Sequence, residues 1–203
     1  MTSSRGAGRF ARGLGALYLR LAGWRIEGRF PDIAKAVVIA APHTSNWDLP
    51  LMLAIAAVLG IRPAWLGKRE LFRWPVGRLM RALGGLPVDR AARQNLVQQA
   101  VDRLGSVDRL HLVIPPSGTR SRATHWKSGF YHIARGGRVP VVCAFLDYRR
   151  RVGGIGPVLM ASGDVAGDMA RIRAFYADIA GKFPEAATPV RLRDEEESVP
   201  AAS

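Results

Sequence analysis

The sequence contains one cysteine, Cys143, and no long hydrophobic run. A single cysteine excludes an intramolecular disulfide, which is typical of proteins from a reducing compartment. Cys143 lies within an apolar run and nothing adjacent would activate it, so we interpret it as a small buried side chain. The longest uncharged apolar run, residues 49–61, is too short to cross a bilayer as a helix. Glycines and arginines interrupt the first apolar cluster, so the sequence also lacks a clean secretory signal.

Several catalytic and ligand-binding motifs are also missing. There is no glycine-rich phosphate loop with a following Lys-Ser/Thr pair, and no Gly-x-Ser-x-Gly nucleophile turn. Three of the four histidines, His111, His125 and His132, have no carboxylate or cysteine at metal-ligand spacing. His43 and Asp48 together would give a metal only two protein ligands, which is too few for a good site. We therefore predict neither a metal site nor a bound cofactor.

Acidic residues are scarce relative to basic ones. The chain has 30 Lys and Arg against 16 Asp and Glu, which gives a formal net charge of +14. This surplus favours a polyanionic partner, such as nucleic acid, an anionic membrane surface or a phosphorylated substrate. The bases are spread along the chain and no known nucleic-acid-binding module is present, so we expect no nucleic acid partner. With 203 residues, 48% of them hydrophobic, the chain suits one globular domain.

The chemistry concentrates in residues 37–48. An apolar run rich in β-branched residues ends at Pro42, His43 and Asp48 follow five positions apart, and a second apolar run begins at Leu49. The two runs predict a buried strand and a buried helix, with the polar residues on the turn between them. His43 can accept a proton near neutral pH, and Asp48 can fix its tautomer through the other ring nitrogen. The alternative is that His43 caps the helix and Asp48 is a first-turn acid that the helix dipole favours.

Four blocks together resemble the motifs of the glycerolipid acyltransferases, the family of the lysophosphatidate acyltransferases. The first block is His43-x4-Asp48, and the second is Gly84-Gly85-Leu86-Pro87-Val88-Asp89-Arg90. The third is Ser117-Gly118-Thr119-Arg120, where the family usually has Glu-Gly-Thr-Arg, and the fourth is the apolar segment Val139-Pro140-Val141-Val142. The blocks occur in the family's order and with family-like gaps.

The resemblance implies an acyltransferase in which His43, oriented by Asp48, takes the proton of an acceptor hydroxyl as it attacks an acyl thioester. The donor would be acyl-CoA or acyl-carrier protein, and the acceptor a lysophospholipid-like molecule such as 1-acylglycerol-3-phosphate. In this family-matching site, Arg90 and Arg120 would hold the acceptor phosphate through bidentate guanidinium contacts. Ser117, Gly118 and Thr119 would line the same pocket, the last two with backbone amides as neutral donors.

Two other functions remain open at this stage. Ser117 replaces the family's glutamate and carries no charge, which leaves room for an acceptor without glycerophosphate, such as an amino-acid lipid or a glycolipid. The net charge leaves room for a non-catalytic basic protein that binds lipid or nucleic acid.

We predict three segments: a basic amphipathic segment at 1–22, an acyltransferase domain at 23–184, and a polar disordered tail at 185–203. In the first segment one helical stripe is basic and the opposite stripe is apolar, with Arg5, Arg9, Arg12 and Arg20 facing away from Phe10, Leu14, Leu17, Tyr18 and Leu21. Such a helix can lie in an anionic membrane interface or pack its apolar stripe on the domain, and its glycines weaken it. We expect a cytoplasmic protein, peripheral on the inner face of the membrane.

The rest of the chain alternates strands and helices. We predict strands at 36–41, 63–66, 86–88, 110–114, 139–146 and 157–160, and helices at 49–59, 91–104, 125–134 and 169–183, with two short helical pieces within 68–83. Residues 153–156, Gly-Gly-Ile-Gly, read as a turn. This pattern indicates a single-domain α/β fold with a mostly parallel sheet flanked by helices. Functional loops should then gather at one edge of the sheet.

Overall fold

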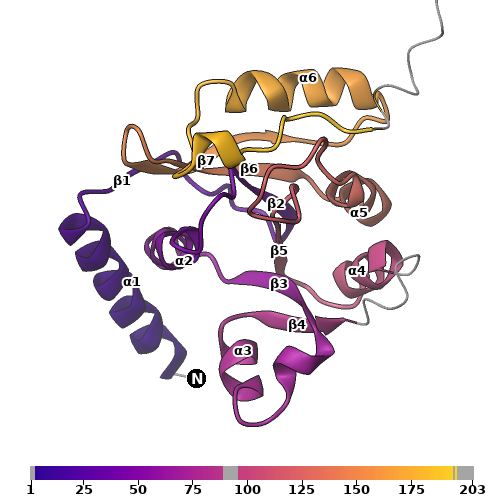
Figure 1. The fold of residues 1–203 in the computed structure, drawn as a ribbon. Helices are drawn as coiled ribbons and strands as arrows, with labels where there is room; N and C mark the ends of the chain where they lie inside the picture. The colour runs from indigo at the N-terminus through magenta and orange to yellow at the C-terminus, as the bar shows by residue number, and fades with distance from the viewer. Residues whose placement is uncertain (1–2, 89–95, 194, 196–203) are drawn as a thin grey trace, which may run out of the picture.

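The computed structural model describes residues 3–88, 96–193 and 195, with the backbone alone for residues 3–7 and Lys68. The elements, in chain order, are α1 (Ser3–Leu21), β1 (Arg25–Glu27), β2 (Lys35–Ala41), α2 (Asp48–Leu59), β3 (Pro63–Lys68), η1 (Arg69–Phe72), α3 (Gly77–Ala82), β4 (Gly85–Val88), α4 (Leu96–Gly105), β5 (Leu110–Ile114), α5 (Gly129–Gly137), β6 (Val141–Asp147), β7 (Val152–Leu159), α6 (Val165–Tyr176) and η3 (Pro184–Ala186) (Figure 1).

A seven-stranded sheet in the order β1-β7-β6-β2-β5-β3-β4 runs through the molecule. Every neighbouring pair is parallel except β6 and β7, which confirms the predicted single-domain α/β fold with a mostly parallel sheet. In Figure 1 the helices α1 and α2 lie on one side of the central strands, and α4 and α5 lie on the other. Since β2, β4, β5 and β6 run in the same direction, the loops that follow them emerge at one edge of the sheet.

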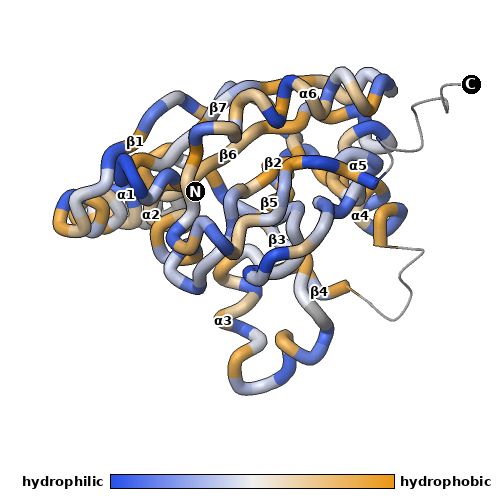
Figure 2. Tube along the Cα trace, turned by 45° about the horizontal axis from the view of Figure 1, so that its top comes forward, coloured by the Kyte–Doolittle hydropathy of each residue, from blue (hydrophilic) through white to orange (hydrophobic). Residues whose placement is uncertain are grey.

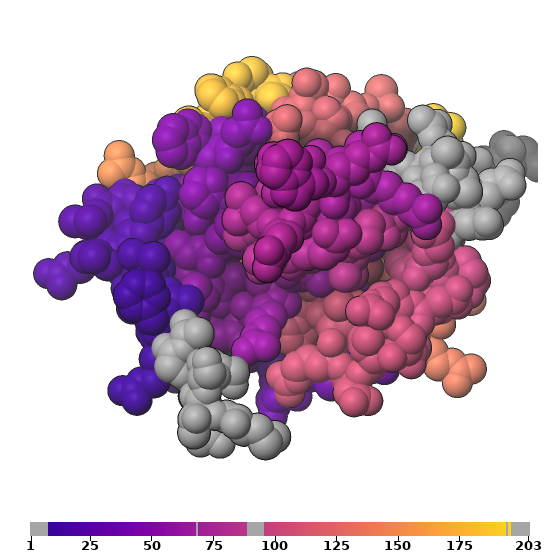
Figure 3. All heavy atoms as spheres, turned by 90° about the horizontal axis from the view of Figure 1, so that it is seen from below, coloured from indigo at the N-terminus to yellow at the C-terminus, as the bar shows by residue number. Residues whose placement is uncertain are grey.

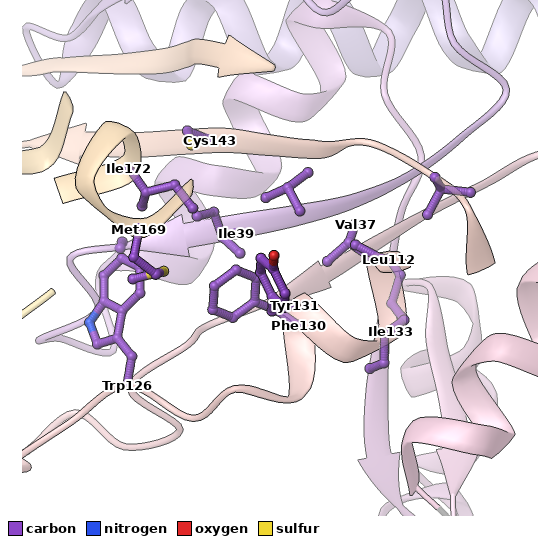
Figure 4. Packing of buried hydrophobic residues seen from close by; sticks show 14 of the residues in the cluster. Val37, Ile39, Leu112, Trp126, Phe130, Tyr131, Ile133, Cys143, Met169 and Ile172 are labelled. Carbon is purple, nitrogen blue, oxygen red and sulfur yellow. The ribbon is translucent and has the colours of Figure 1, made fainter. Parts of the chain in front are cut away.

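Side chains of β2 alternate between two cores, as a strand covered on both faces requires. Val37 and Ile39 join a large cluster that includes Phe130 of α5 and Met169 of α6 (Figure 4). Ala36 and Val38 face the other side, where they pack with Ile155 of β7. Cys143 of β6 is fully buried in the first cluster, and burial raises the pKa of its thiol to about 12, so it is a packing residue at neutral pH.

The glycine run at 153–156 does not form the predicted turn, because it lies inside β7. The strand β1, which the sequence did not predict, pairs with it, and a Cβ at Gly154 would lie 1.9 Å from the carbonyl oxygen of Glu27. The glycines therefore allow the close approach of an edge strand and do not break the chain. The last helix is also shorter than predicted, since α6 ends at Tyr176.

The predicted disorder from residue 185 onward is wrong for residues 185–193. Leu192 is fully buried and forms an isolated parallel bridge with Trp126. Thr188 accepts a hydrogen bond from the backbone of Ala123, 3.1 Å, and the carbonyl of Val190 accepts one from Arg173, 2.8 Å. This segment covers the end of the large core, so the domain extends past residue 184.

The N-terminal helix α1 is present, but it does not pack through its apolar stripe. It contacts α2 through Gly15 and Leu19, and a Cβ at Gly15 would lie 2.8 Å from the carbonyl oxygen of Ala54. The stripe of Phe10, Leu14, Leu17, Tyr18 and Leu21 stays exposed. Hydrophobic and hydrophilic residues alternate along α1 in Figure 2. Among the described residues, no helix combines the length and the apolar character needed to span a membrane.

Candidate active site

His43 and Asp48 form a hydrogen-bonded pair at the carboxyl edge of the sheet. The loop after β2 carries His43, and Asp48 is the first residue of α2. His43 Nδ1 lies 2.9 Å from Asp48 Oδ2. The side chain of His43 is 20% exposed, whereas that of Asp48 is 1% exposed. The pair therefore has a buried carboxylate and a ring that a substrate can reach.

Four donors hold the carboxylate of Asp48. Its Oδ2 accepts hydrogen bonds from the amides of Thr44 and Ser45, 3.1 Å each, besides that of His43. Its Oδ1 accepts one from the hydroxyl of Tyr148, 2.7 Å. Burial acts to raise the pKa of Asp48, but the hydrogen bonds from His43, Tyr148 and Ser45 outweigh it and lower the pKa below its ordinary value. An ionised Asp48 makes Nδ1 of His43 the donor, which leaves Nε2 as the nitrogen that can accept a proton.

Tyr148 is a member of the site that the sequence did not reveal. It follows β6, the neighbour of β2, and Trp24 packs edge-on against its ring at 5.0 Å between centroids. Burial and the hydrogen bond to Asp48 raise the pKa of the tyrosine hydroxyl, so it stays a donor at neutral pH. Its position just beyond the carboxyl end of a predicted central strand is the signal that would have found it.

The segment 180–183 lies against the same loop. Its Ala180 carbonyl accepts a hydrogen bond from the amide of Tyr148, 2.9 Å, and the amide of Phe183 donates to Thr44 Oγ1, 3.2 Å. Gly181 has no room for a side chain, because a Cβ there would lie 2.7 Å from Thr44 Oγ1. These contacts place the ammonium of Lys182 over the ring of Trp47, 5.2 Å from its centroid. A cation thus lies beside the loop that carries His43.

The third block forms the loop after β5, the other strand that flanks β2. Ser117 is 7% exposed, and its hydroxyl donates to the carbonyl of Thr119 at 2.7 Å. Gly118 has φ +65°, and a Cβ there would meet the side chain of Lys127 at 2.7 Å. Ser117 is therefore buried and stabilises the turn by its hydrogen bond, while Gly118, Thr119 and Arg120 are exposed. The hydroxyl of Ser117 is directed into the loop and is not presented on the surface.

The second and fourth blocks have different positions. Gly84, at φ +82°, leads into β4, and a Cβ there would lie 1.9 Å from the carbonyl oxygen of Pro63. Asp89 and Arg90 follow β4 but lie outside the described residues, so the predicted contact of Arg90 with phosphate stays a prediction. The fourth block precedes and begins β6, and the carbonyl of Pro140 accepts a hydrogen bond from the amide of Val37, 3.0 Å. It contributes to the core and not to the site.

Metal-binding side chains do not gather anywhere in residues 3–88 or 96–193, where no group of three His, Cys, Asp or Glu is placed to hold an ion. The geometry of His43 and Asp48 is one that a general base with an orienting carboxylate can use. An ordered alcohol hydroxyl near Nε2 would lose its proton to His43 as its oxygen attacks an electrophile.

A mostly parallel α/β sheet with a His–Asp pair at its carboxyl edge is an arrangement that can serve an enzyme with a histidine base. The sequence model of the Acyltransferase family matches residues 25–146, and the chain belongs to this family. Among solved structures, it is similar to the 1-acyl-sn-glycerophosphate (LPA) acyltransferase PlsC from Thermotoga maritima, with 20% identity and a TM-score of 0.61 over 87% of this chain and 80% of that one. That likeness shows a shared fold. A search of curated proteins gave no match.

The matched region ends before two parts of the site. Tyr148 and the segment 180–183 both follow residue 146, yet both contact the segment from His43 to Asp48. The matched region therefore includes His43 and Asp48, and the later part of the chain adds the hydroxyl donor to Oδ1 of Asp48 and the nearby cation.

Proposed function

We propose that the protein transfers a fatty acyl group from an acyl thioester, either acyl-CoA or acyl-carrier protein, to the hydroxyl of a lysophospholipid-like acceptor, with 1-acylglycerol-3-phosphate as the preferred acceptor. The observation that carries the proposal is the accessible His43 ring, held by a buried carboxylate that accepts four hydrogen bonds. Membership of the acyltransferase family supplies the reaction class.

The reaction needs no covalent acyl-enzyme. Nε2 of His43 takes the proton of the acceptor hydroxyl while the oxygen attacks the thioester carbonyl carbon. When the tetrahedral intermediate collapses, the C–S bond breaks, and the thiol leaves with the proton that the imidazolium returns. Asp48 stabilises the imidazolium between these two steps, because its carboxylate remains charged and hydrogen-bonded to Nδ1.

A thiol-release assay tests this function. Purified protein is mixed with acyl-CoA or acyl-carrier protein and a panel of lyso-lipids that includes phosphate-bearing and phosphate-free acceptors. Thiol release that depends on a lysophospholipid, with the diacyl product detected by mass spectrometry, supports the proposal. Release only with an amino-acid lipid or a glycolipid assigns a different acceptor, and no release with any pair refutes the enzyme activity.

We further propose that Arg120, with Arg90 and Lys182, attracts the anionic group of the substrates. Replacing Arg120 by lysine keeps the charge but removes the planar fork, so the acceptor KM should rise by about tenfold while the donor KM changes little. The matched control is Arg122→Lys, another exposed arginine two residues later. Steady-state kinetics with 1-acylglycerol-3-phosphate measure both constants. Equal acceptor KM values in the parent and in Arg120→Lys would remove Arg120 from the acceptor site.

We propose that the exposed apolar stripe of α1 binds an anionic membrane surface, which would place the protein on the cytoplasmic face of the membrane. The support is the packing of α1, which uses Gly15 and Leu19 for the contact with α2 and leaves the large apolar side chains outside. The exposed arginines Arg9, Arg12 and Arg20 supply a basic side to the same helix.

The double substitution Leu14→Gln with Leu17→Gln should weaken binding to anionic vesicles at least about tenfold, because two exposed apolar side chains are lost from the interface. Both residues are more than half exposed, so the melting temperature should stay within about 2 °C of the parent. Vesicle sedimentation measures the binding. Ala16→Gln, exposed on the basic side of α1, is the control. If binding is the same in the parent and the double variant, α1 is not the membrane contact.

A further inference from the structure

The segment between β3 and β4, residues 69–83, forms a projecting unit that we call the arm. It contains η1 and α3 and is the lowest part of the molecule in Figure 1. Its base is fixed by Phe72, which is 6% exposed. The ring of Phe72 lies where a side chain at Gly67 or Gly85 would be, with Cβ positions 2.9 Å and 2.7 Å from ring atoms. The two glycines on β3 and β4 therefore form the socket for this ring.

The arm is also held by its own hydrogen bonds. Nη1 of Arg81 donates to the carbonyls of Phe72, 3.3 Å, and Gly77, 3.4 Å, and the guanidinium lies 5.5 Å from the centroid of the Phe72 ring. Gly77 packs on the same carbonyl, since a Cβ there would lie 2.0 Å from the Phe72 oxygen. The fold of the arm thus depends on Phe72, Gly77 and Arg81, and the side chains that point outward are not needed to hold it.

Those outward side chains are large and apolar. Trp74 is 90% exposed, Leu79 56%, Val76 50% and Leu71 45%. Single exposed apolar residues are ordinary, but a group of four on one short projection with a fixed base marks a contact surface. We call Leu71, Trp74, Val76 and Leu79 the tip.

The positive charge around the tip indicates which kind of partner the tip contacts. The arm carries four arginines, Arg69, Arg73, Arg78 and Arg81, against one acid, Glu70. The first three of these arginines are exposed, and they take no part in the hydrogen bond that Arg81 donates to the carbonyl of Phe72. An apolar tip with an exposed tryptophan and surrounding arginines has the composition that inserts at the headgroup level of an anionic bilayer. A partner protein with a matching apolar groove would not require this surplus of positive charge.

We propose that the arm is a second membrane contact, in which Trp74 and Leu79 enter the interface of an anionic lipid surface while Arg73 and Arg78 contact lipid phosphates. The arm and α1 both face the viewer in Figure 3, which looks up at the molecule from below, with α1 at the left and the arm toward the centre. This inference extends the proposed membrane partner from one segment to two, and it does not depend on acyl transfer. Two separate contacts would fix the orientation of the domain on the surface, which a single helix leaves free to rotate.

The test compares a tip variant, Trp74→Ser with Leu79→Ser, with a control variant, Val158→Ser with Met160→Ser. The control residues are 45% and 56% exposed and lie at and just beyond the end of β7. Vesicles contain either phosphatidylcholine alone or phosphatidylcholine with 30% phosphatidylglycerol, where the lipid percentage is roughly that of an anionic membrane surface. Sedimentation of the full-length protein should show at least about tenfold weaker binding of the tip variant to anionic vesicles, and parent-like binding of the control.

A second variant separates charge from insertion. Arg73→Gln with Arg78→Gln should weaken binding to the anionic vesicles by about thirtyfold and leave the weak binding to phosphatidylcholine unchanged, because each of the two basic residues attracts the surface only where the lipid is anionic. The loss should shrink as the salt concentration rises.

Three results would overturn the proposal. The first is parent-like binding of the tip variant to anionic vesicles. The second is a parent protein that sediments as a dimer, together with a tip variant that sediments as a monomer and binds vesicles like the parent. That result would assign the tip to a contact with a second copy of the chain. The third is a tip variant that melts far below the parent, which would make these residues structural. Because vesicle binding is measured without substrate, failure of this proposal and failure of the acyltransferase proposal are distinguishable.

Discussion

Replacing His43 by alanine should lower the rate of thiol release at least about a hundredfold, which is the usual contribution of a positioned general base. The variant folds, because the carboxylate of Asp48 keeps its hydrogen bonds from Thr44, Ser45 and Tyr148. We expect the loss to fall on kcat, since in the proposed mechanism His43 acts on the hydroxyl during the chemical step and does not hold the donor. Initial rates with acyl-CoA and a saturating lyso-lipid measure it, and circular dichroism checks the fold.

The control for His43→Ala is His132→Ala. His132 is an exposed histidine on α5, so the same substitution there removes a ring without touching Asp48. It should leave kcat within about twofold of the parent, as surface substitutions generally do. Near-parental thiol release by His43→Ala would show that another group takes the proton, and the assignment of His43 would fail.

The sequence could predict the centre of the fold because local pattern and tertiary structure agree there. The β-branched run before Pro42 is a central strand buried on both faces, and the apolar run after Asp48 is a helix, as their compositions indicate. The pairing of His43 with Asp48 follows from this geometry, since five residues span the turn between the end of the strand and the first turn of the helix. The structure forms the hydrogen bond between His43 and Asp48, and the orienting role of Asp48 in catalysis stays a prediction.

Other elements could not be predicted, because they depend on neighbours that are distant in the sequence. Glycines predict a turn when only the local chain is considered, but Gly154 is required in β7 by the approach of Glu27. Residues 185–193 show no periodic pattern, and their structure depends on contacts with distant residues, such as the bridge of Leu192 with Trp126 and the hydrogen bond between Thr188 and Ala123. The role of Tyr148 depends on a strand order that places β6 beside β2, and no local pattern contains that order.

The N-terminal helix shows the limit of amphipathic patterns in another way. Its two stripes predict which residues share a face, and the exposure of Leu14 and Leu17 agrees with a single apolar side. The amphipathic pattern does not predict which side of α1 packs on the rest of the domain. Close packing on α2 requires a residue without a side chain at the contact, and Gly15 provides it. The glycines that weaken the helix by propensity are thus partly explained by packing, which outweighs propensity in tertiary context.

The two oxygens of Asp48 are not equivalent, and this decides what its substitutions will do. Oδ2 accepts from three donors, two of them rigid backbone amides, whereas Oδ1 accepts from the hydroxyl of Tyr148 alone among the residues that the structure describes. An asparagine at this position would direct its oxygen to the three donors and its NH2 to the tyrosine oxygen, which can accept as well as donate. His43 would then keep its tautomer and lose only the charge of its partner.

Asp48→Asn should therefore lower kcat by about tenfold to a hundredfold, because the imidazolium loses a charged partner but Nε2 still accepts the proton. Asp48→Ala should lower kcat further, by at least about a thousandfold, since the ring loses its orientation as well. Alanine also leaves the buried amides of Thr44 and Ser45 without their acceptor, which should cost about 3 kcal/mol of stability and roughly 6–12 °C in Tm. The kcat of the conservative variant Tyr148→Phe should lie between that of the parent and that of Asp48→Asn. The substitution removes the donor to Oδ1 and leaves the His43 contact in place.

The pH dependence of unfolding provides the measurement that separates charge from shape at Asp48. The pKa of Asp48 lies below its ordinary value of 3.8, so the unfolded chain binds this proton more readily than the folded one. The stability that the ionised carboxylate contributes is then complete above the ordinary pKa and is lost as the pH falls through the lower, folded value. The Tm gap between the parent and Asp48→Asn should narrow as the pH falls below about 5, while part of the gap to Asp48→Ala should persist because its amides remain unpaired at every pH. If the Asp48→Asn gap is independent of pH down to acid unfolding, or if Asp48→Asn keeps the kcat of the parent, the carboxylate does not act on His43 through its charge. If asparagine and alanine lower kcat equally, the carboxylate does not act by orienting the ring.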